Sequence, residues 1–152
     1  SIPAKTQIDQ LVSTIDLLPT ICAITGADLP ENKIDGINVF DVLQNKKMPQ
    51  LDERFYYYHK GNKLLGVRQG SWKYLSPSTY NEIKLPGEDA RPGISTWQTD
   101  FPEALFDLDT DVRELNNRLD DYPEKASFLK NQLTLFQKIL DKEARPIGEM
   151  ER

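Results

Sequence analysis

The sequence predicts an α+β fold in which a small antiparallel sheet packs against one long C-terminal helix, with helical segments earlier in the chain. Residues 54–75 alternate runs of β-forming side chains with glycine turns, which is typical of a β-meander. Residues 122–140 carry apolar side chains at alternating steps of four and three, the period of one helix face. Because three short strands alone bury too little apolar surface to be stable, we expect helices to cover one face of the meander.

The first apolar stretch, residues 8–24, has close to helical spacing, and Pro19 decides where the helix begins. With Asp16 as the N-cap, Pro19 falls in the first turn, where its missing amide proton costs little. Gly26 then stands where a left-handed residue ends a helix. A second, shorter helix is expected over residues 39–44.

The meander is predicted from three runs, 55–58, 64–67 and 72–75, and from the two turns between them. Gly61 and Gly70 lie at those turns and tolerate the left-handed backbone that a tight reversal needs. Aromatic side chains fill the first run, and large apolar residues alternate with others in the third, as expected for strands with one covered face.

A long connection, residues 76–103, follows the meander and is rich in proline and glycine. Connections of that length are unusual inside a compact domain and are typical of a functional loop or an insertion. A fourth strand is predicted directly after it, over residues 104–108.

The acidic run that begins at Asp107 and ends at Asp111 does not fit a calcium-binding loop. Such a loop requires glycine at its sixth position and an acid at its twelfth, and these positions hold Val112 and Arg118. We expect Asp111 instead to cap a short helical turn over residues 113–115.

The last element is predicted as a helix with one broad apolar face. Pro123 stands in its opening turn, and Asp120 and Asp121 lie beside its positive end. The face is made by Tyr122, Ala126, Leu129, Leu133, Phe136 and Leu140, and it is widened by Phe128, Leu135 and Ile139. A face this broad is expected to lie flat on a sheet rather than to pair with another helix.

Composition and charge argue against several classes of function. The net charge of -5 argues against a nucleic-acid partner, and the longest apolar stretch, 17–24, is too short to cross a bilayer, so we expect no membrane partner. The sequence does not fit a serine or cysteine catalytic triad. Its single histidine is His59, and it has no serine or cysteine nucleophile framed by glycines. Zinc spacings, phosphate-binding glycine loops and dinucleotide fingerprints are absent from the sequence. The single cysteine, Cys22, has apolar neighbours and is expected to be buried and unreactive.

Three groups of short motifs follow one another in an order shared with one enzyme family. The first group is S-T-I-D-L-L-P-T-I at 13–21, then Gly26, Leu29-Pro30 and D-G-I-N-V at 35–39. The second is F-Y-Y-Y at 55–58 with V-R-Q-G-S-W-K at 67–73, and the third is L-F-D-L at 105–108 with Asp111, Glu114 and Asn116-Asn117. Together they cover about the whole chain, which resembles the C-terminal part of the formylglycine-dependent sulfatases. Within this alkaline-phosphatase-like superfamily it is similar to the arylsulfatases and N-acetylgalactosamine-6-sulfatases.

The resemblance implies that residues 1–50 are the tail of a catalytic-core region, an α/β structure, and that 51–152 form a C-terminal sulfatase subdomain. Family members hydrolyse sulfate esters with calcium and a formylglycine made from a cysteine or serine that proline and arginine follow. Neither the calcium-binding aspartate motif nor the formylglycine motif occurs in this sequence. Cys22 cannot be the modified residue, because alanine, isoleucine and threonine follow it. We therefore expect calcium and formylglycine in a missing N-terminal catalytic region. This chain is expected to hold no catalytic residue or metal ligand and to be inactive alone.

By the same resemblance, the end of the aromatic strand is expected to wall the substrate cleft. The candidate substrate-binding residues are His59 and Lys60, with Tyr58 and Asn62 beside them and Trp97 in the long connection. A cation there would suit a sulfated carbohydrate. The plainer alternatives are that His59 is only solvated, that Lys60 is surface charge and that Trp97 pins the connection.

Two other functions stay open at this level. The meander could present tyrosine and tryptophan to a glycan as an autonomous binding module, or the chain could belong to a related phosphodiesterase or phosphonate hydrolase. A periplasmic or secreted location is implied by the resemblance alone. The chain opens on S-I-P-A without methionine or a signal peptide, which is typical of a processing boundary.

Overall fold

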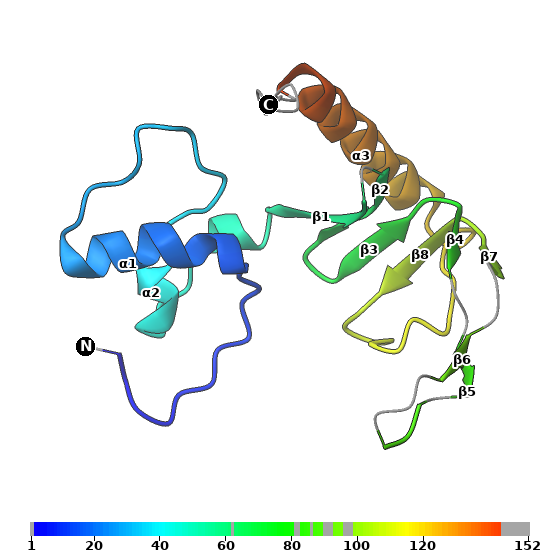
Figure 1. Ribbon diagram of the computed structural model, residues 1–152, viewed down its shortest axis with the longest axis horizontal. Coiled ribbons are helices and arrows are strands. Elements are labelled where there is room, and N and C mark those ends of the chain that lie inside the picture. The colour runs from blue at the N-terminus through cyan, green and yellow to red at the C-terminus, as the bar shows by residue number, and fades with distance from the viewer. Residues whose placement is uncertain are drawn as a thin grey trace, which may run out of the picture. The chain divides into compact units, whose positions relative to one another are not determined.

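The computed structural model describes residues 2–61, 63–80, 83–85, 87–89, 93–95 and 99–143, and it confirms the predicted α+β class. The chain forms two compact units, one ending at Arg54 and the other beginning at Phe55 (Figure 1). The division between residues 50 and 51 stays a prediction about sulfatase subdomains. Within the described ranges, no helix combines the length and apolarity that a membrane span requires.

The first unit is built from short helical elements. These are the 3-10 turn η1 (Thr14–Asp16), helix α1 (Leu17–Thr25), helix α2 (Phe40–Leu43) and the 3-10 turn η2 (Pro49–Leu51). The predicted bounds of α1 are confirmed, because Pro19 lies in its first turn and Gly26 ends it with a φ of 74°. Helix α2 is shorter than the predicted 39–44, because the backbone at Val39 (φ -110°, ψ 24°) and at Gln44 (φ -86°, ψ 9°) is not helical.

The apolar side of α1 is largely exposed within this unit. The side chains that form it, Leu17, Leu18, Ile21 and Ile24, are between 47% and 58% exposed. The interior of the unit lies elsewhere, in a cluster of Val39, Val42 and Leu51 against which Ile8, Ile37 and Met48 pack. Helix α1 therefore has an apolar face that its own unit does not cover.

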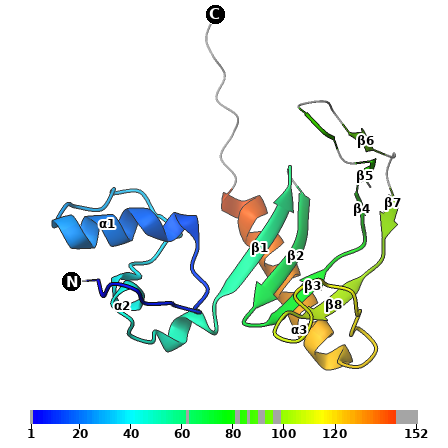
Figure 2. The same cartoon turned by 90° about the horizontal axis from the view of Figure 1, so that it is seen from below.

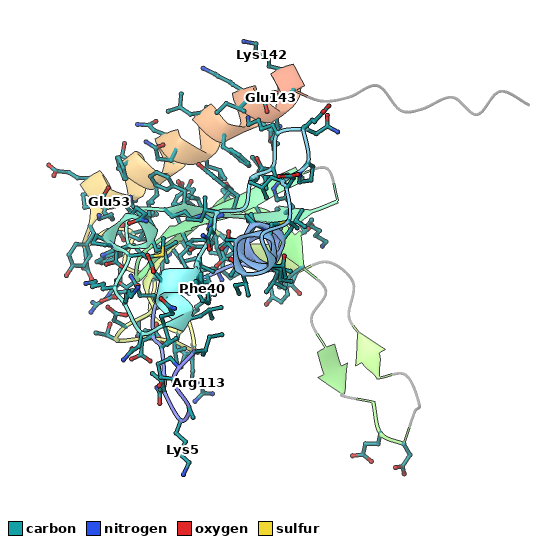
Figure 3. All side chains as sticks on the ribbon, turned by 90° about the vertical axis from the view of Figure 1, so that its left-hand side faces the viewer. Lys5, Phe40, Glu53, Arg113, Lys142 and Glu143 are labelled. Atoms are coloured by element: carbon teal, nitrogen blue, oxygen red, sulfur yellow. The ribbon has the colours of Figure 1, made fainter. Side chains whose placement is uncertain are left out.

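The second unit is a four-stranded antiparallel sheet that α3 (Pro123–Glu143) covers on one face, as Figures 1 and 2 show. The strands lie in the order β1 (Phe55–Lys60), β2 (Lys63–Gln69), β3 (Trp72–Leu75) and β8 (Ala104–Asp107). The meander, the later strand and the long helix are thus confirmed, although β8 ends before Leu108. Lys142 lies in the last turn of α3, where its positive charge interacts favourably with the negative end of the helix dipole (Figure 3).

The core of the second unit lies between the sheet and α3. Tyr57, Val67, Tyr74 and Leu105 are paired in one row across the four strands and meet Ala126, Leu129 and Leu133 of the helix. The prediction that Phe128, Leu135 and Ile139 widen the covered face is wrong, since all three are exposed. With 3.6 residues per turn, they lie roughly a third of a turn around the helix from Leu129 and Leu133, at the margin of the contact with the sheet, where Phe128 still meets Phe55 of β1.

The long connection is a β-arm rather than a loop without strands. Strand β4 (Ser78–Tyr80) pairs with β7 (Thr99–Phe101), and β5 (Ile83–Leu85) pairs with β6 (Ile94–Ser95). The ladder of β4 and β7 continues from β3 and β8, and β5 and β6 lie farther along the arm (Figure 1). The rings of Tyr80 and Phe101 meet edge to face, with centroids 6.1 Å apart, which fixes the base of the arm.

The segment between β8 and α3 bonds to the outer edge of the sheet. Asn117 Oδ1 accepts the amide N–H of Leu105 at 2.9 Å, and the amide N–H of Arg118 donates to the Leu105 carbonyl at 2.7 Å. The helical turn predicted after Asp111 does not form. Instead the Asp111 carboxylate accepts the backbone N–H of Asn116 at 2.7 Å, and this hydrogen bond lowers the pKa of Asp111.

Candidate functional site

The candidate site residues lie where β1 ends beside the first turn of the meander. Tyr58, His59 and Lys60 are its last residues, and the register against β2 shifts between Tyr58 and His59. Asn62 and Trp97 lie outside the described residues, so their placement stays a prediction.

His59 lies on the face of the sheet that α3 covers. Its ring meets the edge of Phe136, with centroids 6.4 Å apart, and Leu64, opposite it on β2, is buried in the core. Tyr57, two residues earlier on the same face, stacks on Phe136 at 3.7 Å. The imidazole therefore lies at the end of a ring cluster, exposed to solvent on one side.

Tyr58 lies on the opposite face of the sheet. Its ring lies 4.9 Å from the ammonium nitrogen of Lys73, which in turn forms an ion pair with Glu114 at 2.7 Å. Lys73 precedes Tyr74, whose side chain is in the α3-facing core, so Lys73 and Tyr58 share the face turned away from α3. The structure thus separates Tyr58 from His59, and the two side chains do not line one face together.

Lys60 reaches the arm. Its Nζ donates a hydrogen bond to the carbonyl oxygen of Thr79 at 3.2 Å, and its cross-strand partner on β2 is Lys63. This contact joins the end of β1 to β4, two elements whose approach no local pattern in the sequence indicates. The role of Lys60 toward a substrate stays a prediction, but its position beside the arm is fixed by this bond.

Two further polar clusters were missed by sequence reasoning. The first is in the unit ending at Arg54, where Asp16 is 1% exposed. Its carboxylate does not cap α1. It accepts hydrogen bonds from Arg54, from the Ser13 amide at 2.9 Å and from the Ile37 amide at 3.0 Å. This cluster holds three distant segments together, and no local pattern marks it.

The second cluster joins the arm, the sheet and α3. The hydroxyl of Tyr74 donates to Glu103 at 2.5 Å, and the ammonium of Lys130 bonds to the same carboxylate at 3.0 Å. Burial, and then the bond to Glu103, raises the pKa of Tyr74, whereas the bonds from Tyr74 and Lys130 lower the pKa of Glu103. The cluster therefore holds a neutral phenol and an ionised carboxylate, an arrangement that suits structure rather than proton transfer at neutral pH.

The described residues do not fit the metal or the nucleophile of a sulfatase. No group of three or more histidine, cysteine, aspartate or glutamate side chains within the described ranges could hold a metal ion. Cys22 lies buried on α1, and its Sγ is 3.7 Å from the carbonyl oxygen of Asp28. The side chains in the described ranges therefore suit neither a calcium site nor a formylglycine nucleophile.

The chain is similar to curated sulfatases over most of its length. It is 30% identical over 124 residues to arylsulfatase A from Bos taurus, which covers 77% of this chain and 24% of that protein. It is 32% identical over 129 residues to human steryl-sulfatase, covering 76% of this chain and 22% of that protein. The chain thus spans about a quarter of the length of the curated relatives it matches. No family model matches it.

Solved structures share the fold. Ps i-CgsB in complex with k-i-k-neocarrahexaose superposes with a TM-score of 0.59 at 19% identity, over 89% of this chain and 26% of that one. A protein from a Bacteroides thetaiotaomicron locus for glycosaminoglycan metabolism superposes with a TM-score of 0.55 at 24% identity, over 81% of this chain and 24% of that one. Both likenesses support the arrangement of sheet and helix described above.

Proposed function

Because the chain belongs to the sulfatases and matches their C-terminal part, we propose that it forms the C-terminal subdomain of a sulfuric ester hydrolase that acts on a sulfated glycan. Its similarity to an arylsulfatase and a steryl-sulfatase supports the reaction class. The glycan is supported by two structural neighbours, one from a locus for glycosaminoglycan metabolism and one in complex with a neocarrahexaose. By the same kinship we propose a periplasmic or secreted location.

The observation that carries this proposal is the exposed apolar face of α1. Leu17 and Ile21, one turn apart, are 58% and 54% exposed, and Ile24 extends the same stripe. Burying one such side chain fully is worth about 1.5–3 kcal/mol, so a stripe of them strongly favours a covering surface. We propose that the catalytic region of the longer protein covers this face. That region would also supply the calcium and the formylglycine, since the residues that the structure describes form no cluster that could hold a metal ion.

In this proposal the second unit walls the substrate cleft. Tyr58, on the sheet face turned away from α3, and Lys60, beside the arm, present an aromatic ring and a cation at the end of β1. A cation at the wall of a cleft raises the local concentration of a sulfated substrate and favours its binding. His59 would take part only from the other side of the sheet, beyond the ring of Phe136.

Activity measurements test the proposal. The chain alone, and the chain joined to the catalytic region proposed to precede it in the same reading frame, would be coexpressed with a formylglycine-generating enzyme. Both would be assayed with 4-methylumbelliferyl sulfate and with a sulfated oligosaccharide. We expect hydrolysis only from the joined protein. Sulfatase activity of the chain alone, or a joined protein that hydrolyses phosphate diesters and no sulfate ester, would overturn it.

A further inference from the structure

The base of the arm holds a surface pocket of about 490 Å³ at the corner where β4 begins and β7 ends. It is lined by Lys63, Pro77, Ser78, Thr79, Asp100, Phe101 and Pro102. The lining offers an ammonium, two hydroxyls, a carboxylate and an aromatic ring. A pocket with a hydrophobic wall and a few convergent polar groups is typical of a small-molecule site.

Two lysines meet at this corner. Lys60, the last residue of β1, and Lys63, the first residue of β2, are direct cross-strand partners. Like charges placed directly opposite one another destabilise a strand pair. Within the part of the chain that the structure describes, neither lysine forms an ion pair with a carboxylate, and Lys60 bonds only to the uncharged carbonyl of Thr79. The corner is therefore positive in a chain whose net charge is -5.

The aromatic part of the pocket is already oriented. Phe101 lines the pocket and meets Tyr80 edge to face, and Tyr80 is 42% exposed beside it. Large aromatic side chains contribute much of the contact area in such sites, and here the ring contact restricts their motion. Asp100 forms no ion pair with a described lysine, so its carboxylate is available to accept hydrogen bonds from hydroxyl groups.

We propose that this pocket is a subsite for one anionic sugar residue, with Lys63 and Lys60 holding its sulfate or carboxylate group. An ammonium has three donors, so Lys60 can keep its bond to Thr79 and still donate to an anion. Asp100 and the hydroxyls of Ser78 and Thr79 then bind the ring hydroxyls, and Phe101 supplies an apolar wall. This inference rests on the proposed function, which supplies the glycan. It specifies further where one sugar residue of that glycan binds and that this residue is anionic.

Binding to the 152-residue chain, labelled with ¹⁵N, tests the subsite. The probes are a chondroitin 6-sulfate disaccharide, the unsulfated chondroitin disaccharide and inorganic sulfate. We expect the sulfated disaccharide to shift the amide signals of residues 63, 78–79 and 100–101 and to bind more tightly than either other probe. Equal binding of inorganic sulfate, or shifts confined to other residues, would show that no sugar subsite exists there.

Charge variants complete the test. Lys63→Gln should weaken binding of the sulfated disaccharide at least about tenfold, since it removes a charge-assisted hydrogen bond to the anionic group. Lys63→Arg should retain most of the affinity, and Lys138→Gln, an equal charge change on the exposed side of α3, should leave it unchanged. Spectra of each variant report whether it folds. Equal losses in Lys63→Gln and Lys138→Gln would overturn the subsite, whereas the sulfatase assay of the joined protein tests the reaction independently.

Discussion

Arg54 donates hydrogen bonds from one guanidinium nitrogen to both carboxylate oxygens of Asp16, at 2.9 and 2.8 Å, across 38 residues of sequence. The carboxylate is 1% exposed, and the same guanidinium group reaches the Asp35 carbonyl at 3.3 Å. The pair therefore links the start of α1, the loop that follows α1 and the end of the first unit.

Replacing Arg54 with methionine should strongly destabilise the first unit. The change leaves the Asp16 carboxylate buried without its charged partner, and breaking a buried pair from one side costs about 3–5 kcal/mol. Hydrogen–deuterium exchange of the α1 amides measures the loss. The matched control is Lys46→Met, which breaks an ion pair with Asp41 whose side chains are 62% and 58% exposed and should cost less than about 1 kcal/mol. Equal effects of the two changes would contradict the role given to Arg54.

The stacking of Phe136 on Tyr57 predicts which apolar side of α3 stabilises the second unit. Their ring centroids are 3.7 Å apart, whereas Phe128 is exposed and meets Phe55 at 6.1 Å. Phe136→Ala should therefore lower the free energy of unfolding by about 2 kcal/mol, less than the cost at a fully buried phenylalanine. Phe128→Ala should change it by less than about 1 kcal/mol. Urea titrations followed by tryptophan fluorescence measure both costs. A larger cost for Phe128→Ala than for Phe136→Ala would contradict the assignment of the helix face that packs on the sheet.

The bond between Tyr74 and Glu103 predicts a change in acid stability. The folded-state pKa of Glu103 is lowered, first by Tyr74 and then by Lys130, so its stabilising effect is full above its unfolded pKa and is lost as the pH falls through the folded value. Tyr74→Phe should raise the pKa of Glu103 and cost about 1 kcal/mol near neutral pH. The cost should shrink as Glu103 becomes protonated. A carbon-detected NMR titration of Glu103, with urea midpoints from pH 3 to 7, measures both effects.

At alkaline pH the stability should change with pH in the opposite direction, because of Tyr74. The pKa of Tyr74 is raised by its burial and by Glu103, so its contribution is full below the unfolded tyrosine pKa of 10.0 and is lost as the pH rises toward the folded value. The wild-type chain should therefore lose stability above about pH 10 more steeply than Tyr74→Phe does. Identical slopes in the two proteins would show that the phenol does not couple ionisation to folding.

Local periodicity was sufficient to predict the meander, the later strand, α1 and α3, because each is specified by neighbouring residues. It failed where the structure depends on contacts between residues far apart in sequence or on strands too short to show a period. The arm strands are two or three residues long and lie among prolines and glycines, so no period is visible. The pairs of Asp16 with Arg54 and of Lys60 with Thr79 join segments far apart in sequence. Tyr58 and His59 were grouped by nearness in sequence, and strand alternation separates them.

The exposed face of α1 gives the last prediction, which concerns association. Leu17, Ile21 and Ile24 form an apolar stripe on the first unit, and such a stripe favours self-association when nothing covers it. The chain alone should therefore form oligomers at micromolar concentration in sedimentation velocity experiments. Replacing Leu17 and Ile21 with serine should suppress them with little change in the folding of α1, whose capping by Gly26 is untouched.

In the protein joined to its proposed catalytic region, the same double substitution should have the opposite consequence. There the stripe would be buried, so two truncated side chains should lower the free energy of unfolding by about 3 kcal/mol or more. Thermal unfolding of the joined protein and its double variant measures this difference. A matched pair, Leu115→Ser and Val112→Ser, alters two apolar side chains that are exposed in the second unit and should leave the melting temperature nearly unchanged. If the α1 variant melted at the wild-type temperature, the catalytic region would not cover this face, and another surface would have to hold the two parts together.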